Sequence, residues 1–169
     1  MKICLLFSMF LLATGMSAQQ HVSTEVQKKN ILLEEFTGIH CGNCPDGHKI
    51  ANNLAAAQEG IVYTIAIHSG HYAVPNVGEP DYRIPEGEAI DTYFGVNSSY
   101  GYPSGTINRR QLPSYPYVLN RGVWTKAAKY VHAEDAPVNL WMNASFDGNS
   151  RQLTIDVEAY YTADSDSAE

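Results

Sequence analysis

A chain of 169 residues is long enough for one well-packed domain, or for a small domain with part of another. Its acidic side chains outnumber the basic ones by 18 to 11, which gives a formal net charge of −7. Such a surface repels phosphate backbones and anionic membranes, so we do not expect the protein to bind nucleic acid.

The first eighteen residues have the pattern of a secretory signal peptide. Lys2 supplies a short positive start, residues 3–13 form an apolar run too short to span a bilayer, and small residues follow up to Ala18. No later segment is apolar enough for a transmembrane span. The sequence therefore predicts an exported protein of the periplasm, the outer membrane or the cell surface. Removal of the peptide takes away Cys4 and leaves ten basic against eighteen acidic side chains, a charge of −8.

A strand–helix–strand unit follows a polar, flexible lead-in over residues 19–27. The apolar run ILLEEF, residues 31–36, predicts one strand, and IVYTIAI, residues 61–67, predicts another that is covered on both faces. The alanine-rich stretch between them favours a helix. Pro45 places the start of that helix at the cysteines, because proline is tolerated only in the first turn. This order predicts a βαβ unit with a parallel pair of strands.

The next segment, residues 69–102, is rich in Gly, Pro, Tyr and Ser. It is too long for an ordinary connection, so we expect a functional or capping loop with one short helix over residues 88–94. A short strand, SGTIN, follows Pro103, and residues 120–134 predict an amphipathic helix.

After residue 137 the pattern changes to strict alternation. Residues 138–146 and 153–161 flank DGNS, which predicts a β-hairpin. Two strands alone are marginal in water, and one face of this hairpin is an apolar row that needs a cover. We therefore expect residues 136–169 to begin a β-sandwich-like domain whose other strands lie outside this chain. We also expect a protease to cut near residues 134–137 and to leave a folded core.

Cys41 and Cys44 remain after export, and an oxidising compartment favours a disulfide between them. At the start of a helix, unpaired N–H groups and the helix dipole favour a thiolate at Cys41. Such a pair can exchange disulfides, with Cys41 attacking a partner and Cys44 displacing it. The alternative is a structural disulfide that never turns over, although so small a ring constrains the unfolded chain little.

The residues around Cys41 and Cys44 give less support to a metal site or to haem attachment. Haem attachment requires a histidine directly after the second cysteine, where Pro45 stands. Zinc would need ligands beside the cysteines, but there is no second C-x-x-C, and an oxidised pair cannot ligate a metal. The sequence therefore predicts neither a metal nor a cofactor. The histidines that zinc would have to recruit are His40, His48, His68 and His71.

Five features in chain order resemble the thioredoxin-fold superfamily. They are LLEEF, the turn HCGNCP, the helix after it, VYTIAI, and YFGV followed by GYPSGTI. The resemblance implies an α/β domain with a cis Tyr102–Pro103 bond facing the cysteines, a C-terminal helix, and Tyr102 offering its backbone to a substrate peptide. It also implies that Glu35 is the buried carboxylate that relays a proton to Cys44, and an ordinary solvent-facing glutamate is the alternative.

The turn departs from that family at two places. His40 stands where relatives usually carry tryptophan or tyrosine, and its charge would either stabilise a Cys41 thiolate or do nothing. The enclosed dipeptide, Gly42-Asn43, matches neither the reducing nor the oxidising type and leaves the redox direction open.

Three stretches are similar to a narrower family, the twenty-eight-kilodalton outer-membrane proteins of Gram-negative bacteria. They are LLEEFTGIHCGNCPDGHKIAN, IAIHSGHYA and YGYPSGTINR. That resemblance implies a thioredoxin-like domain over residues 28–135 and a partial β domain over residues 136–169. The leading expectation is thiol–disulfide exchange on envelope proteins. The alternative is a non-catalytic surface or adhesion protein with an inert disulfide.

Overall fold

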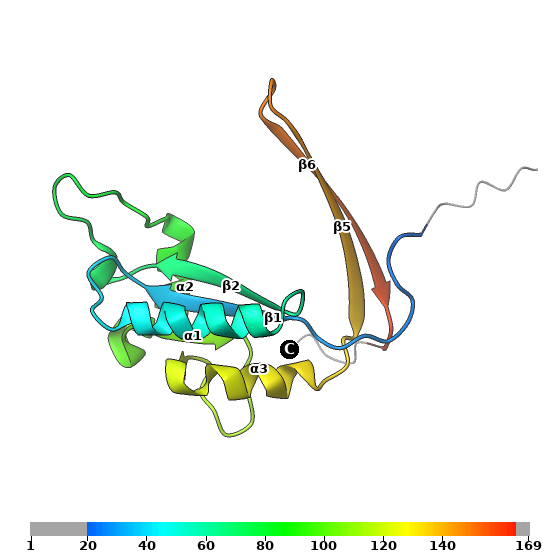
Figure 1. The fold of residues 1–169 in the computed structure, drawn as a ribbon, viewed down its shortest axis with the longest axis horizontal. Coiled ribbons are helices and arrows are strands. Elements are labelled where there is room, and N and C mark those ends of the chain that lie inside the picture. The colour runs from blue at the N-terminus through cyan, green and yellow to red at the C-terminus, as the bar shows by residue number, and fades with distance from the viewer. Residues whose placement is uncertain (1–19, 165–169) are drawn as a thin grey trace, which may run out of the picture. The chain divides into compact units, whose positions relative to one another are not determined.

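The computed structural model describes residues 20–164, which divide into two compact units (Figure 1). The larger unit spans residues 26–137, and the smaller one combines the chain up to residue 25 with the chain from residue 138. The predicted signal peptide and Cys4 lie outside the described residues. Within those residues, no helix has both the length and the apolar character needed to cross a membrane.

A four-stranded mixed sheet in the order β2-β1-β3-β4 forms the centre of the larger unit. Strand β1 (Ile31–Thr37) pairs in parallel with β2 (Val62–His68). On its other side β1 pairs antiparallel with β3 (Ser104–Ile107), which pairs antiparallel with the short β4 (Leu119–Asn120). Helix α1 (Cys44–Ala57) links the parallel pair, so the predicted βαβ unit is confirmed.

The two parallel strands differ in burial because of their places in the sheet. β1 lies between two strands, and its side chains are almost all buried. β2 is an edge strand, and Tyr63 and Ile65 are exposed. The expectation that this strand is covered on both faces was therefore wrong, since an apolar run can also form a half-exposed edge strand.

Helices lie on both faces of the sheet (Figure 1). Helices α1 and α3 (Trp124–His132) pack on one face, where Trp124 is fully buried and donates its indole N–H to the carbonyl of Leu119. Helix α2 (Pro85–Phe94) covers the other face. It begins three residues earlier than expected because Pro85 starts it, and it ends at Gly95, whose φ of 66° is left-handed.

The end of the larger unit is hydrogen-bonded to the beginning of the same unit. Ala136 donates its N–H to the carbonyl of Gln27, and Lys28 forms a bridge and an ion pair with Asp135. The larger unit therefore ends at Pro137, two residues beyond the expected boundary at residue 135. The region where we expected proteolysis is tied to residues 27–29.

The smaller unit consists of a long hairpin, as expected, and the segment that precedes the larger unit. β5 (Val138–Asp147) and β6 (Gln152–Tyr161) pair antiparallel along their full length. His21 stacks on Trp141 at 4.4 Å between ring centroids and bonds to Glu158. The segment expected to be a free lead-in is therefore held to one face of the hairpin in residues 20–25.

The other face of the hairpin is apolar and exposed. Its register places Leu140 opposite Ala159, Met142 opposite Val157 and Phe146 opposite Leu153, all on one side of the ribbon. The large apolar side chains exposed on this face are Leu140, Met142, Phe146, Leu153, Ile155 and Val157.

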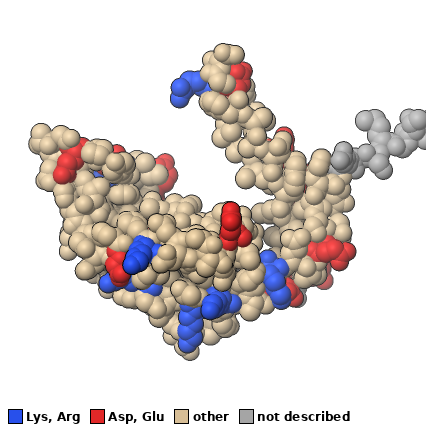
Figure 2. Space-filling model, in the orientation of Figure 1, with Lys and Arg blue, Asp and Glu red and all other residues tan. Residues whose placement is uncertain are grey.

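Charged side chains of both signs are interspersed on the face seen in Figure 2. Ion pairs join charges of opposite sign in the larger unit, for example Lys28 with Asp135 and Arg121 with Asp46.

Candidate functional site

The cysteine pair lies at the start of α1, and Cys41 and Cys44 form a disulfide. Asn43 is the N-cap, Cys44 is the first helical residue, and Pro45 occupies the first turn. Cys41 therefore precedes the helix by one tight turn, closed by a hydrogen bond from the Cys44 N–H to the Cys41 carbonyl at 3.2 Å. The disulfide bonds its sulfur to that of Cys44, the first residue of the helix.

Both cysteines are buried, and the exposed fractions of the two residues differ slightly. Cys44 is 1% exposed and Cys41 is 6% exposed, while Gly42 and Asn43 between them are exposed. Cys41 is therefore slightly the more exposed of the two residues.

The turn rests on the segment that follows β2. The His40 N–H bonds to the Tyr72 carbonyl, and the Cys41 N–H bonds to the Gly38 carbonyl, both at 3.0 Å. A Cβ on Gly38 would come within 2.4 Å of the Tyr72 backbone. Glycine at this position therefore lets the 70–73 backbone approach the cysteine turn.

The Tyr102–Pro103 peptide bond is cis, as the sequence resemblance implied. Pro103 lies against the first turn of α1, because a Cβ on Gly47 would fall 2.9 Å from its ring carbons. The same Cβ would fall 2.6 Å from Oε1 of Glu35. Gly47 is thus the point where the helix of the cysteines, Pro103 and Glu35 meet.

Replacing Gly47 with alanine is expected to lower the free energy of unfolding by about 1–2 kcal/mol. The new methyl group would overlap the Glu35 carboxylate and the Pro103 ring, and this cost exceeds the gain of somewhat under 1 kcal/mol that alanine brings to a helix. Chemical denaturation measures the difference. Gly42→Ala is the matched control, because a Cβ there meets nothing within 4 Å. Equal stability of the two variants would contradict the packing described here.

Glu35 is buried at 3% exposure, so the solvent-facing alternative does not hold. Its Oε2 bonds to Nδ1 of His48 at 2.9 Å, and its Oε1 is buried without a hydrogen-bond partner among the described residues. Burial raises the pKa of Glu35, and the charge and hydrogen bond of His48 oppose that rise. A carboxyl group with a raised pKa in this place is suited to accept and release a proton.

His48 was considered in the sequence only as a zinc ligand. The structure places it on α1, one turn after Cys44, with its Nε2 at 3.2 Å from the Thr37 hydroxyl. The spacing of four residues from Cys44 is the signal that could have brought it to attention. Among the described residues, no group of three or more His, Cys, Asp or Glu is arranged to hold a metal ion.

His40, the residue before Cys41, is directed toward another segment. Its Nε2 lies 2.9 Å from Oε2 of Glu79 and 3.1 Å from Nδ2 of Asn76. A protonated His40 is therefore paired with the Glu79 carboxylate. This pairing weakens any stabilisation that His40 could give to a Cys41 thiolate.

Tyr102 is anchored through Asp91, a residue that the sequence did not single out. Asp91 is 3% exposed and accepts hydrogen bonds from the Tyr102 hydroxyl, from the Ser69 hydroxyl at 2.7 Å and from the Asn97 N–H at 3.0 Å. Burial first, and then the bond to Asp91, raise the pKa of Tyr102. The side chain beside Pro103 is therefore a fixed hydroxyl donor.

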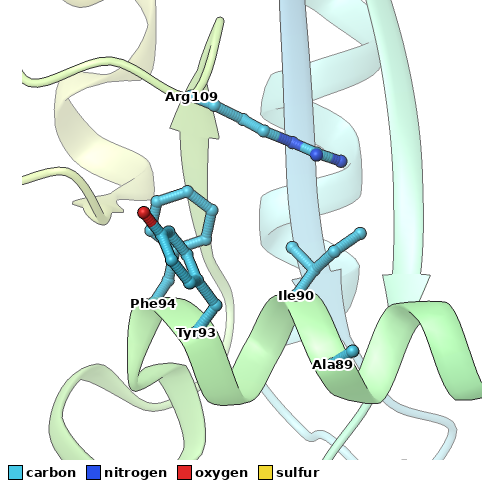
Figure 3. Close-up of a pocket in the computed structure, with 5 residues that line it drawn as sticks. All are labelled: Ala89, Ile90, Tyr93, Phe94 and Arg109. Atoms are coloured by element: carbon cyan, nitrogen blue, oxygen red, sulfur yellow. The ribbon is translucent and has the colours of Figure 1, made fainter. Parts of the chain in front are cut away.

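A pocket of about 420 Å³ lies on the α2 side of the sheet (Figure 3). Ala89, Ile90, Tyr93 and Phe94 of α2 line it together with Arg109. The guanidinium of Arg109 is paired with the buried Glu34 of β1. Glu34 and Glu35 are neighbours on a strand, so they face opposite sides of the sheet, and the pocket is separate from the cysteine site.

No family model matches this chain, and no curated protein does. Among solved structures, a protein of Agrobacterium tumefaciens determined as structural-genomics target AtR35 matches with a TM-score of 0.51 and 14% identity, over 81% of this chain and 70% of that one. HBP35 of Porphyromonas gingivalis matches with a TM-score of 0.43 and 17% identity, over 70% of this chain and 38% of its own. At 14% identity, the likeness to the Agrobacterium protein shows the fold alone, a mixed α/β architecture.

Proposed function

We propose that this chain is a thioredoxin-like protein that exchanges disulfides with exported partner proteins. The observation that carries the proposal is that three features meet at the start of α1. There, the Cys41–Cys44 pair, Pro103 and the buried Glu35 all contact the first turns of α1. A disulfide that served only as a cross-link would need neither a buried carboxyl group nor the proline at this place.

In the reduced form, the Cys41 thiolate attacks one sulfur of a partner disulfide. A mixed disulfide forms, the partner's own S–S bond breaks, and the departing thiolate takes a proton. Cys44 then gives up its proton and attacks Cys41, which releases the second thiol of the partner and forms the Cys41–Cys44 disulfide. Two electrons pass from the protein dithiol to the partner, and the same steps run in reverse when the protein oxidises its partner.

The start of α1 favours the attacking anion. The dipole of this helix favours a thiolate at Cys41, which lies just before its first turn. Asp46 in the same turn works against that effect, but its carboxylate is paired with Arg121 at 2.6 Å. The negative charge nearest to the helix start is thus partly neutralised.

The proposal is tested by catalysed reduction of a small disulfide-bonded protein with dithiothreitol as the electron source. We expect the mature chain to raise the rate at least about tenfold over dithiothreitol alone. A rate equal to that of dithiothreitol alone would mean that the Cys41–Cys44 disulfide is structural and does not turn over.

One observation favours a second function, a non-catalytic binding protein of the outer membrane or cell surface. The apolar row on β5 and β6 is exposed, and contiguous exposed apolar surface marks interaction sites. A variant with both cysteines changed to serine separates the two functions, since a binding role keeps its affinity for cell envelopes and a redox role loses its activity.

A further inference from the structure

His48 links a buried carboxyl group to solvent. Its Nδ1 lies 2.9 Å from Oε2 of Glu35, which is 3% exposed, while 40% of the His48 side chain is exposed. The Thr37 hydroxyl at 3.2 Å from Nε2 holds the other side of the ring. The imidazole is thus oriented by two residues of β1 and still reaches water.

The two oxygens of Glu35 have different surroundings. Oε2 is occupied by His48, and Oε1 is buried, has no hydrogen-bond partner among the described residues and faces Gly47. Gly47 is three residues after Cys44, so the free oxygen lies beside the first turn of the helix that carries Cys44. Burial without a hydrogen-bond donor at Oε1 disfavours the ionised carboxylate and so favours a proton on Glu35.

We propose that His48 is the positioning partner of Glu35 and passes the proton of the resolving step to solvent. This inference rests on the proposed function. When Cys44 attacks the mixed disulfide, its proton moves to the Glu35 carboxylate, and Glu35 then releases a proton through the His48 imidazole to water. The path runs backward when the protein oxidises a partner, and the proton is then taken up.

The titratable groups around His48 come from three elements. Glu35 faces it from β1, His68 acts on it from β2, and Cys44 lies one turn back on α1. Burial, and then the charge of His48, lower the pKa of His68. The charge of His48 thus acts on both neighbours: it opposes protonation of His68 and favours the ionised form of Glu35.

His48→Gln tests the proposal, because glutamine keeps a hydrogen-bond donor for Glu35 but cannot titrate. The measurement is the rate of the resolving step against pH, in a single turnover that starts from a mixed disulfide on Cys41. Loss of the imidazole removes the group that opposes the rise in the pKa of Glu35, so the carboxylate that accepts the proton forms only at higher pH. We expect the resolving step to slow about tenfold near neutral pH and its inflection to move to higher pH.

Two comparisons make the result decisive. Attack by Cys41 on the partner should stay within about twofold of the wild-type rate, because that step does not use Glu35. His132→Gln on α3, whose ring bonds to the Lys29 carbonyl, should keep the wild-type profile.

A wild-type profile in His48→Gln, or equal slowing of both steps, would overturn the role of His48. Absence of turnover in the wild-type protein would instead overturn the proposed function itself.

Discussion

Cys41→Ser is expected to lower the rate of disulfide exchange at least about 100-fold, because it removes the attacking sulfur. Cys44→Ser should instead form a mixed disulfide with the partner and hold it, since attack by Cys41 remains possible and release does not. The place of Cys41 just before the helix start, where the dipole favours a thiolate, is the structural reason for assigning these roles in this order. Non-reducing gel electrophoresis and mass spectrometry of the trapped species measure the outcome.

The two variants control for each other. Each breaks the same small ring, so any loss of stability from the missing cross-link is shared between them. A difference in their reactivity therefore reports the separate roles of the sulfurs. If both variants kept the wild-type rate of exchange, or if mixed disulfides accumulated in Cys41→Ser instead, the assigned order of attack would be wrong.

Asp91→Ala is expected to lower the free energy of unfolding by about 3 kcal/mol. Asp91 accepts hydrogen bonds from Tyr102, Ser69 and the backbone of Asn97, and alanine leaves these donors without their acceptor in a largely buried place. Chemical denaturation measures the loss. Because Tyr102 precedes Pro103, the exchange rate should fall as well, even at temperatures where the variant remains folded.

Tyr102→Phe separates the two effects of Asp91. It removes one of the three donors and leaves the carboxylate in place, so its cost should be about 1 kcal/mol. If Asp91→Ala were as stable as the wild-type protein, the network would not hold the segment after β2 in the manner described.

Local pattern predicted the elements whose length and periodicity are strong. The parallel pair with its helix, and the hairpin, follow from apolar runs, alternation and the position of Pro45. Strand β4 has two residues, Leu119–Asn120, and no periodicity can show so short an element. The exposure of β2 depends on its place at the edge of the sheet, which the run IVYTIAI does not encode.

The residues of the candidate site also divide into those that the sequence could indicate and those that only the fold brings together. The cysteines stand out by spacing, whereas the significance of Pro103 and Glu35 came from a resemblance between sequences. The contributions of His48 and Asp91 depend on contacts with Glu35 and Tyr102 on other elements, 13 and 11 residues away. The pocket beside α2 includes Arg109, which follows β3, so it exists only after the chain has folded.

The proposed function requires that Cys41 is a reactive thiol at the start of α1 and not one half of an inert structural disulfide. The most direct measurement is the rate of alkylation of Cys41 against pH in the reduced protein, followed by peptide mass spectrometry. We predict a pKa clearly below the value of about 8.5 for a free thiol, because the helix N-terminus stabilises the thiolate. A pKa at or above that value would contradict the role of Cys41 as the attacking thiol.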